Sequence, residues 1–159
     1  MGSVKRIIDK CIDIVAGVAM GIVFLVTFLQ VISRYAFQLN IPWSTDIIRL
    51  TFIYTVFFGA AIGMKEKGHL SMDILMSVLP KRAQIVLGLG INAVLIAFLV
   101  FVVRYGIQFT LGALTQNMPY LNMPISVLYA AIPVTAVLMI FYLVLNIGEQ
   151  IGELKHTKA

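Results

Sequence analysis

Four long apolar stretches constrain the fold of this chain more than any other feature. Three of them carry no Asp, Glu, Lys, Arg or His: Ile14–Ser33 with 20 residues, Ala83–Val103 with 21 and Ile125–Ile147 with 23. About 20 helical residues cross the roughly 30 Å of hydrocarbon in a bilayer. A buried helix of a water-soluble domain rarely runs this long without a polar face. These three stretches therefore predict transmembrane helices.

The remaining apolar stretch is shorter and has a polar end. Leu50–Met64 is free of charge for 15 residues, which as a helix cover about 22 Å. Extending it back to Trp43 gives 22 residues but includes Asp46 and Arg49. Those two side chains lie on one helical face, where they can pair or reach the lipid headgroups. Trp43 fits an interfacial anchor. We predict a second span with a polar turn at its start.

The composition leaves no room for a second domain. The chain has 159 residues, of which 60% are hydrophobic and 12% are charged. A typical soluble domain has about 25% charged residues, roughly twice as many. The sequence predicts an all-α, polytopic integral membrane protein in which residues 1–159 form one four-helix domain. The expected spans cover residues 11–34, 43–64, 83–105 and 125–148. The helical pattern of the third span continues past Val103 to about Leu114, which predicts a tilted or protruding helix.

The basic residues are divided unevenly between the two sides of the membrane. Nine of the twelve Lys and Arg lie on the side that holds both termini and the connection between spans two and three. The other side holds three: Arg34, Arg49 and Arg104. The positive-inside rule therefore predicts that both termini are cytoplasmic. The basic residues that cause the net charge of +5 are interpreted as setting the orientation of the chain in the membrane. Lipids, and not nucleic acid, are therefore the expected partners.

The connection between spans two and three is expected to lie on the membrane surface. Apolar residues recur in it at helical spacing until Pro80, at Leu70, Ile74, Leu75 and Val78. This pattern favours a short amphipathic helix in the interface, with an ordinary loop as the alternative. Basic residues in and around the connection are expected to attract anionic headgroups. They are Lys65, Lys67, Lys81 and Arg82.

Small residues at a spacing of four predict sites of close helix packing. Two such pairs are Gly17 with Gly21 in span one and Gly59 with Gly63 in span two. Glycine lets two backbones approach closely, and we expect at least one pair to pack within the chain. Whether the other contacts a partner stays open at this point. Ala93 and Ala97 offer a weaker version in span three. Pro133 is expected to kink span four, with Thr135 meeting the freed backbone.

Groups that carry catalysis are scarce in this sequence. His69 and His156 fall in cytoplasmic segments, and Cys11 is the single cysteine, so no haem, metal or other cofactor is expected. An enzyme is not expected either. A small proton-coupled multidrug-type transporter needs an acid inside its first span, whereas Asp13 lies at the membrane edge. Two alternatives stay open: such a transporter dependent on Asp13, and a structural subunit of a membrane complex.

Several short motifs resemble one family of membrane subunits. The pattern is Arg with an aromatic residue, then Pro-x-Trp-(Ser/Thr)-x-(Glu/Asp), then Arg, followed by a Gly-His-(apolar)-x-x-Asp turn. Residues 34–37, 41–46, Arg49, 57–61 and 67–73 are similar to the family in these regions, with the departure that Pro42 directly precedes Trp43. This resembles the small membrane subunit of tripartite ATP-independent periplasmic (TRAP) transporters, the DctQ-like family. Asp46 stands where Glu is commoner, which keeps the charge.

The resemblance implies a role beside a larger partner in the bacterial inner membrane. In this family a large membrane subunit holds the sodium and substrate sites, and a periplasmic binding protein delivers the substrate. The small subunit is non-catalytic and packs against the static scaffold of the large one. The sequence is most similar to members that transport sialic acid (N-acetylneuraminate). Carried over to this chain, four residues would be structural or interfacial: Arg34, Trp43, Asp46 and Arg49.

Overall fold

The computed structural model describes residues 2–67 and 81–156, with side chains placed for residues 5–65 and 87–148. The expected interfacial helix around Leu70–Val78 lies outside these residues. Five helices occupy the described chain, and no strand is present in it. They are α1 (Gly2–Ala36), α2 (Pro42–Lys67), α4 (Lys81–Gly112), α5 (Ser126–Tyr129) and α6 (Ala131–His156).

Four segments of these helices are long and apolar enough to cross a membrane. They are Lys5–Ala36, Pro42–Lys65, Leu87–Gly112 and Ser126–Gly148. The prediction of an all-α membrane protein with four long apolar helices is thereby confirmed. The helices continue beyond the expected spans, and α4 reaches Gly112, in agreement with the expected continuation to about Leu114. An apolar stretch marks the part of a helix that suits hydrocarbon, whereas backbone hydrogen bonding continues into water.

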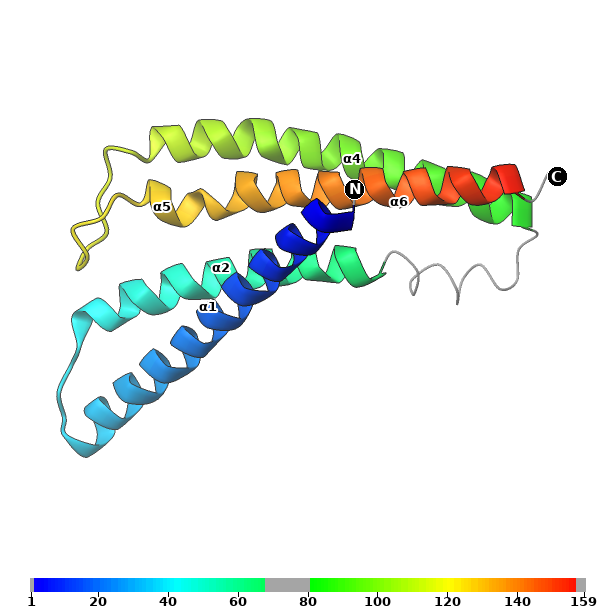
Figure 1. Ribbon diagram of the computed structural model, residues 1–159. Coiled ribbons are helices and arrows are strands. Elements are labelled where there is room, and N and C mark those ends of the chain that lie inside the picture. The colour runs from blue at the N-terminus through cyan, green and yellow to red at the C-terminus, as the bar shows by residue number, and fades with distance from the viewer. Residues whose placement is uncertain (1, 68–80, 157–159) are drawn as a thin grey trace.

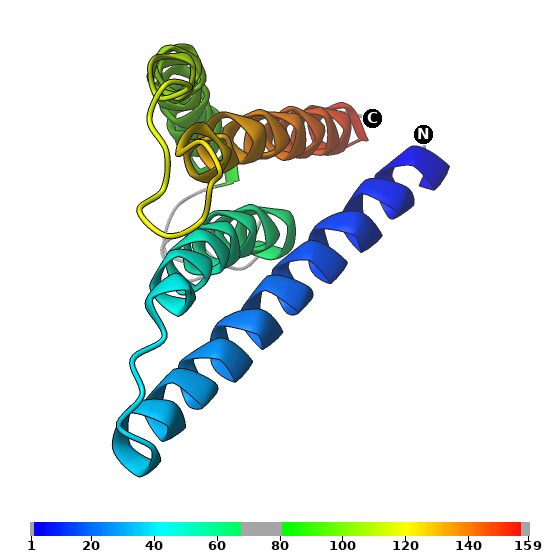
Figure 2. The same cartoon turned by 90° about the vertical axis from the view of Figure 1, so that its left-hand side faces the viewer.

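The helices pack in the order α1, α2, α6, α4. In Figure 1, α4 and α6 lie next to each other, and α1 with α2 forms a second pair below them. Figure 2 shows that α1 is inclined away from α4 and α6. The connections 37–41 and 113–125 lie at one end, here named the loop end. The opposite end, towards which both termini and the close of α2 lie, is named the terminal end. Its assignment to the cytoplasm stays a prediction.

Two clusters of buried side chains hold the helices together. The first joins α2, α4 and α6 through Ala61, Leu99, Ala136, Met139 and Leu143. The second joins α1, α2 and α6 through Ile12, Ala16, Phe58 and Tyr142. Both clusters use alanine where helices meet, which allows close backbone approach between membrane helices. The contacts of α1 are therefore concentrated in its first half.

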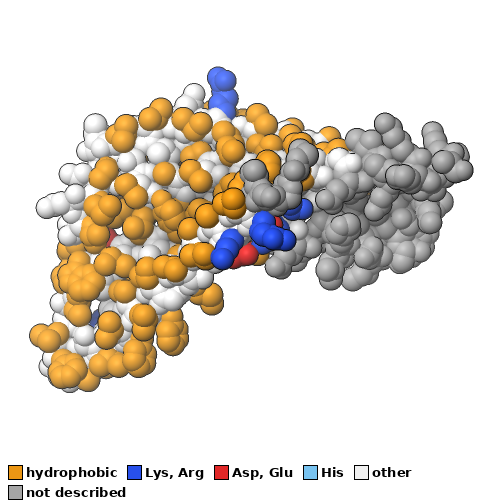
Figure 3. Space-filling view, viewed as in Figure 1, with side chains coloured by type: hydrophobic (Ala, Val, Ile, Leu, Met, Phe, Trp, Pro, Cys, Tyr) orange, Lys and Arg blue, Asp and Glu red, His pale blue; other side chains and the backbone are white. Residues whose placement is uncertain are grey.

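The second half of α1 diverges from the rest of the bundle. Its large apolar side chains are mostly exposed, with Phe24 at 71% and Met20 at 65%. Between α1 and α2 a hollow of about 330 Å³ is lined by Ile14, Val18, Ile22, Leu50, Thr51 and Tyr54. Figure 3 shows apolar side chains over this face of the molecule, with charged ones gathered where α1 begins. Such a surface suits a lipid environment or an apolar partner.

The fourth span is interrupted where proline predicts a kink. Helix α5 ends at Tyr129 and α6 begins at Ala131. Pro133 has no N–H to donate to the carbonyl four residues earlier, that of Tyr129, and its ring clashes with this group. The Thr135 hydroxyl donates instead to the Ala131 and Ile132 carbonyls, at 2.6 and 3.2 Å. The predicted place of the break agrees with the structure, whereas Thr135 does not contact the freed carbonyl.

Candidate functional site at the two ends of the bundle

A buried carboxylate organises the loop end. Asp46 lies in the first turns of α2 and its side chain is 5% exposed. Its Oδ2 atom accepts hydrogen bonds from the backbone N–H groups of Tyr120 at 2.8 Å and Leu121 at 3.0 Å. Both donors belong to the connection between α4 and α5. Hydrogen bonds to an ionised acceptor are stronger than neutral ones and offset the cost of burying its charge.

The connection held by Asp46 is itself folded into a compact hairpin. The Met118 N–H donates to the Met123 carbonyl at 2.9 Å, and the Ile125 N–H donates to the Gln116 carbonyl at 2.8 Å. Met118 is 6% exposed, so its side chain serves as the small core of this segment. We name residues 113–125 the α4–α5 connection. Its fold places its backbone donors against the start of α2.

A second link joins α2 to the same region. The Tyr54 hydroxyl donates to the Val127 carbonyl of α5 at 2.9 Å. Carbonyls next to a helix break lack an intrahelical donor, so a phenol can satisfy one of them. Two side chains of α2, Asp46 and Tyr54, therefore bind backbone groups on either side of residue 124. The loop end of the bundle is tied together by polar contacts to α2.

The other residues expected at this end lie at the surface. Trp43 is 50% exposed, and Arg34 and Arg49 are also exposed. Asp46 and Arg49, both in the described chain, form no ion pair, because the Asp46 carboxylate faces the α4–α5 connection. Of the two possibilities for these residues, pairing with each other is absent from the described structure, and contact with lipid headgroups stays a prediction. Sequence patterns pointed to Asp46 but not to its partners, since backbone N–H groups carry no residue signature.

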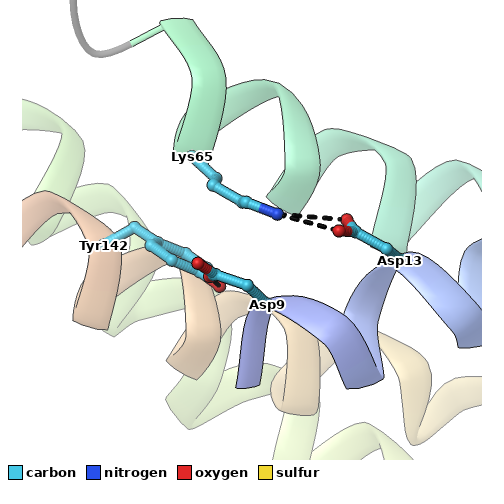
Figure 4. Close-up of polar contacts among 4 residues, drawn as sticks. All are labelled: Asp9, Asp13, Lys65 and Tyr142. Atoms are coloured by element: carbon cyan, nitrogen blue, oxygen red, sulfur yellow. Dashed lines mark hydrogen bonds and ion pairs between the residues drawn. The ribbon is translucent and has the colours of Figure 1, made fainter. Parts of the chain in front are cut away.

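At the terminal end, two acidic side chains of α1 contact its neighbours (Figure 4). The Lys65 ammonium of α2 lies 3.0 and 3.2 Å from the two carboxylate oxygens of Asp13. The Tyr142 hydroxyl of α6 donates to Asp9 Oδ1 at 2.5 Å. Lys65, expected at lipid headgroups, thus has a partner within the chain. The side chains of Lys67, Lys81 and Arg82 lie outside the described part.

The pair between Asp13 and Lys65 is expected to add little stability. The Asp13 side chain is 50% exposed and that of Lys65 is 20% exposed, and exposed pairs contribute at most about 1 kcal/mol. We expect Asp13→Asn, Lys65→Met and the double variant to show a coupling energy below about 1 kcal/mol in detergent unfolding experiments. Loss of proton-coupled flux by the reconstituted Asp13→Asn chain would instead favour the autonomous transporter.

The contact between Tyr142 and Asp9 is expected to matter more. Tyr142 is 3% exposed and belongs to the cluster that fixes α1. Tyr142→Phe keeps the ring but removes a hydrogen bond to a charged acceptor, and we expect unfolding to become easier by about 1.5–3 kcal/mol. Thermal unfolding in a mild detergent measures this. Tyr129→Phe is the matched control, because the Tyr129 hydroxyl has no hydrogen bond to the described residues. Equal effects of the two variants would contradict the assigned role.

The glycine pairs do not form close contacts inside the described chain. A Cβ atom added at Gly17, Gly21, Gly59 or Gly63 would meet no heavy atom of the described neighbouring elements within 4 Å. Alanines form the close contacts between helices instead: Ala61 lies in the first cluster and Ala16 in the second. Use of the glycine faces against a partner stays a prediction.

Comparison with known proteins identifies the family. Residues 23–153 match the family model of the DctQ component of tripartite ATP-independent periplasmic transporters. A protein of Haemophilus influenzae, named as a TRAP transporter small permease protein, is 26% identical over 150 residues, covering 94% of this chain and 91% of the relative.

Two further relatives have names that include a substrate. The C4-dicarboxylate TRAP transporter small permease protein DctQ of Rhodobacter capsulatus is 33% identical over 125 residues, covering 74% of this chain and 54% of the relative. The sialic acid TRAP transporter permease protein SiaT of Haemophilus influenzae is 21% identical over 145 residues, covering 86% of this chain but 22% of the relative. The family match and the four apolar helices together show that this chain belongs to the DctQ family, as a small permease subunit of a TRAP transporter that crosses the bacterial inner membrane several times.

Proposed function

We propose that this chain supports a large membrane subunit that carries the sodium and substrate sites of the transporter. The match to SiaT carries this proposal, because the chain aligns with about a fifth of a much longer permease. In that relative, a segment similar to this chain is joined covalently to further permease sequence. The corresponding arrangement for a separate small chain is a non-covalent complex with a large subunit.

The shape of the bundle supports a scaffolding role. Each membrane-spanning segment has most of its residues unburied within the described chain, and the most buried of them reaches 44%. The apolar side chains in the second half of α1 are mostly exposed, and Figure 2 shows that this half of the helix lies away from α4 and α6. A partner with apolar helices would cover part of this surface. In this proposal the small subunit stays fixed against the static part of the large subunit while the substrate-carrying part moves.

The loop end is proposed to face the periplasm and to help dock the binding protein. The positive-inside rule places the terminal end in the cytoplasm, where most of the basic residues lie. The α4–α5 connection then presents Tyr120, which is 59% exposed and whose backbone is bound by Asp46 near the start of α2. Trp43, in the first turn of α2, is 50% exposed. Exposed aromatic residues on an ordered loop suit either protein docking or headgroup contact. Arg34 and Arg49 are proposed to contribute to the same surface.

The proposed substrate is an organic acid, specifically sialic acid. Relatives named for C4-dicarboxylates and for sialic acid both match the chain, so the choice depends on the sequence resemblance to sialic acid members. In neither case does this chain bind the substrate itself. The proposal assigns substrate and sodium to the large subunit.

Purification of the tagged chain from its native membrane in mild detergent tests the core of the proposal. We expect a large polytopic permease in stoichiometric amount. Reconstitution of that complex with its binding protein should give uptake of N-acetylneuraminate that depends on an inward sodium gradient. Uptake of succinate alone would correct the substrate. Recovery of the chain without a large subunit would reject the scaffold, and flux by the chain alone would favour the autonomous transporter.

A further inference from the structure

Helices α1 and α2 leave a hollow between them, which we name the α1–α2 hollow. It has a volume of about 330 Å³ and is open along one side. Ile14 and Ile22 mark its extent along α1, and Leu50 and Tyr54 do so along α2. All of these residues belong to segments that are long and apolar enough to cross a membrane. The hollow therefore lies at a depth where hydrocarbon chains surround the protein.

The walls of the hollow offer nothing to a polar ligand. Two of the lining residues, Thr51 and Tyr54, carry a hydroxyl. The Thr51 hydroxyl donates to the Ile47 carbonyl of its own helix at 2.7 Å, and the Tyr54 hydroxyl donates to the Val127 carbonyl of α5 at 2.9 Å. Both groups are thus satisfied within the chain. An ordered water needs several polar partners, so an apolar occupant is favoured.

The hollow persists because α1 is held to α2 at both ends and leans away between them. Near the start of α1, Asp13 pairs with Lys65 of α2 at 3.0 Å (Figure 4). At the loop end, residues 37–41 join the two helices directly. Figure 2 shows the inclination of α1. Space between helices forfeits dispersion contacts unless other atoms occupy it.

The size of the hollow favours a lipid chain over a partner helix. Residues 14–22 cover about 12 Å of α1. A helix with its side chains is about 10–12 Å wide, so a segment of this length needs on the order of 1,000 Å³, roughly three times the volume of the hollow. A single acyl chain is thinner and flexible, so it can follow the groove between two inclined helices.

A basic residue stands where the hollow meets the terminal end. Residues spaced by four form one ridge on a helix, and such a ridge leads from the terminal end along the hollow. It consists of Lys10, Ile14, Val18 and Ile22. Lys10 is exposed and lies about 6 Å along the axis from Ile14. The two acidic side chains of the same turns are already bound by neighbouring helices (Figure 4). Positive charge at this place attracts an anionic headgroup.

We propose that the α1–α2 hollow binds one acyl chain of an anionic phospholipid whose phosphate contacts Lys10. The chain fills the space between the helices and stabilises α1 in its inclined position. This inference goes beyond the proposed function and does not depend on it, because it requires only that the chain lies in a membrane. Its failure would leave the complex with a large subunit untouched.

Photolabelling with two lipids tests the site. The full chain, with any protein that copurifies, is placed in nanodiscs of equal amounts of phosphatidylglycerol and phosphatidylcholine with identical acyl chains. In parallel samples one or the other lipid carries a diazirine on its chain, and mass spectrometry maps adducts on the lining residues. We expect about five times more adduct from phosphatidylglycerol, a preference equivalent to about 1 kcal/mol. Equal yields would overturn the proposal, and so would a lack of lipid adducts because a partner helix covers the hollow.

Two pairs of variants separate the headgroup contact from the hollow. Lys10→Gln should bring the ratio of the two yields close to one, whereas Arg104→Gln removes the same charge from the other half of the bundle and should leave it unchanged. Val18→Phe places a ring in the hollow and should lower both yields.

Val94→Phe is the control for Val18→Phe, because it adds the same atoms at a position of α4 that is 70% exposed. An unchanged ratio in Lys10→Gln would reject the anionic headgroup, and unchanged yields in Val18→Phe would reject the hollow as the site. Lys10 and Val18 are both exposed, so the variants should keep the fold, which size-exclusion chromatography checks.

Discussion

Replacing Asp46 with alanine is expected to release the α4–α5 connection from α2 and to impair transport. The substitution removes the acceptor for the Tyr120 and Leu121 N–H groups. Hydrogen bonds to a charged group contribute about 1.5–3 kcal/mol, so local opening of the connection should become about 10–100 times more frequent. If this connection docks the binding protein, substrate uptake should fall even where the complex still assembles.

The accessibility of Met118 reports this opening directly. Met118 is 6% exposed inside the connection, so a cysteine placed there in a Cys11→Ser background should react slowly with a water-soluble maleimide. Asp46→Ala is expected to accelerate this labelling. Arg49→Ala is the matched control, because it removes an exposed charge from the same end of α2 without touching the connection. Equal labelling in the Asp46→Ala and parent chains would refute the role of Asp46.

The sequence predicted those parts of the fold that the bilayer imposes. A spanning helix must form its backbone hydrogen bonds internally and present apolar side chains to lipid. Long apolar stretches such as Ile14–Ser33 indicate both properties. The break near Pro133 was predictable for the same reason, since proline removes a specific backbone hydrogen bond. The continuation of α4 after its apolar stretch ends at Val103 was also predictable, because the helical pattern goes on to about Leu114 and the helix ends at Gly112.

The contacts between helices could not be predicted from the sequence in the same way. Asp46 was recognised as unusual, yet its nearest charged neighbour in the sequence, Arg49, is not its partner. The actual partners are backbone groups 74 and 75 residues away. Glycine pairs suggested close packing, whereas the structure uses Ala61 and Ala136 at the helix crossings. Sequence spacing describes one helix at a time, but crossing points depend on how separate helices tilt.

Replacing Ala61 with leucine is expected to separate the two helix pairs. Ala61 is 0% exposed where α2 meets α4 and α6, and α2 is the helix through which α1 is mainly attached to the rest. Three added carbon atoms have no space there, and overpacking a buried position typically costs about 1–3 kcal/mol. We expect a lower unfolding temperature in detergent and reduced recovery of the complex with the large subunit.

Ala60→Leu is the matched control, because Ala60 is exposed on the adjacent position of the same helix. It adds the same atoms to α2 with the same effect on helix propensity, but it points away from the clusters. A strong effect of Ala61→Leu beside a mild one of Ala60→Leu would locate the stability of the subunit in the alanine contacts between helices. Equal losses would contradict this packing. A strong loss of the complex from Ala60→Leu alone would instead mark the exposed side of α2 as a contact with the large subunit. A larger side chain at an exposed position that faces lipid should disturb folding little.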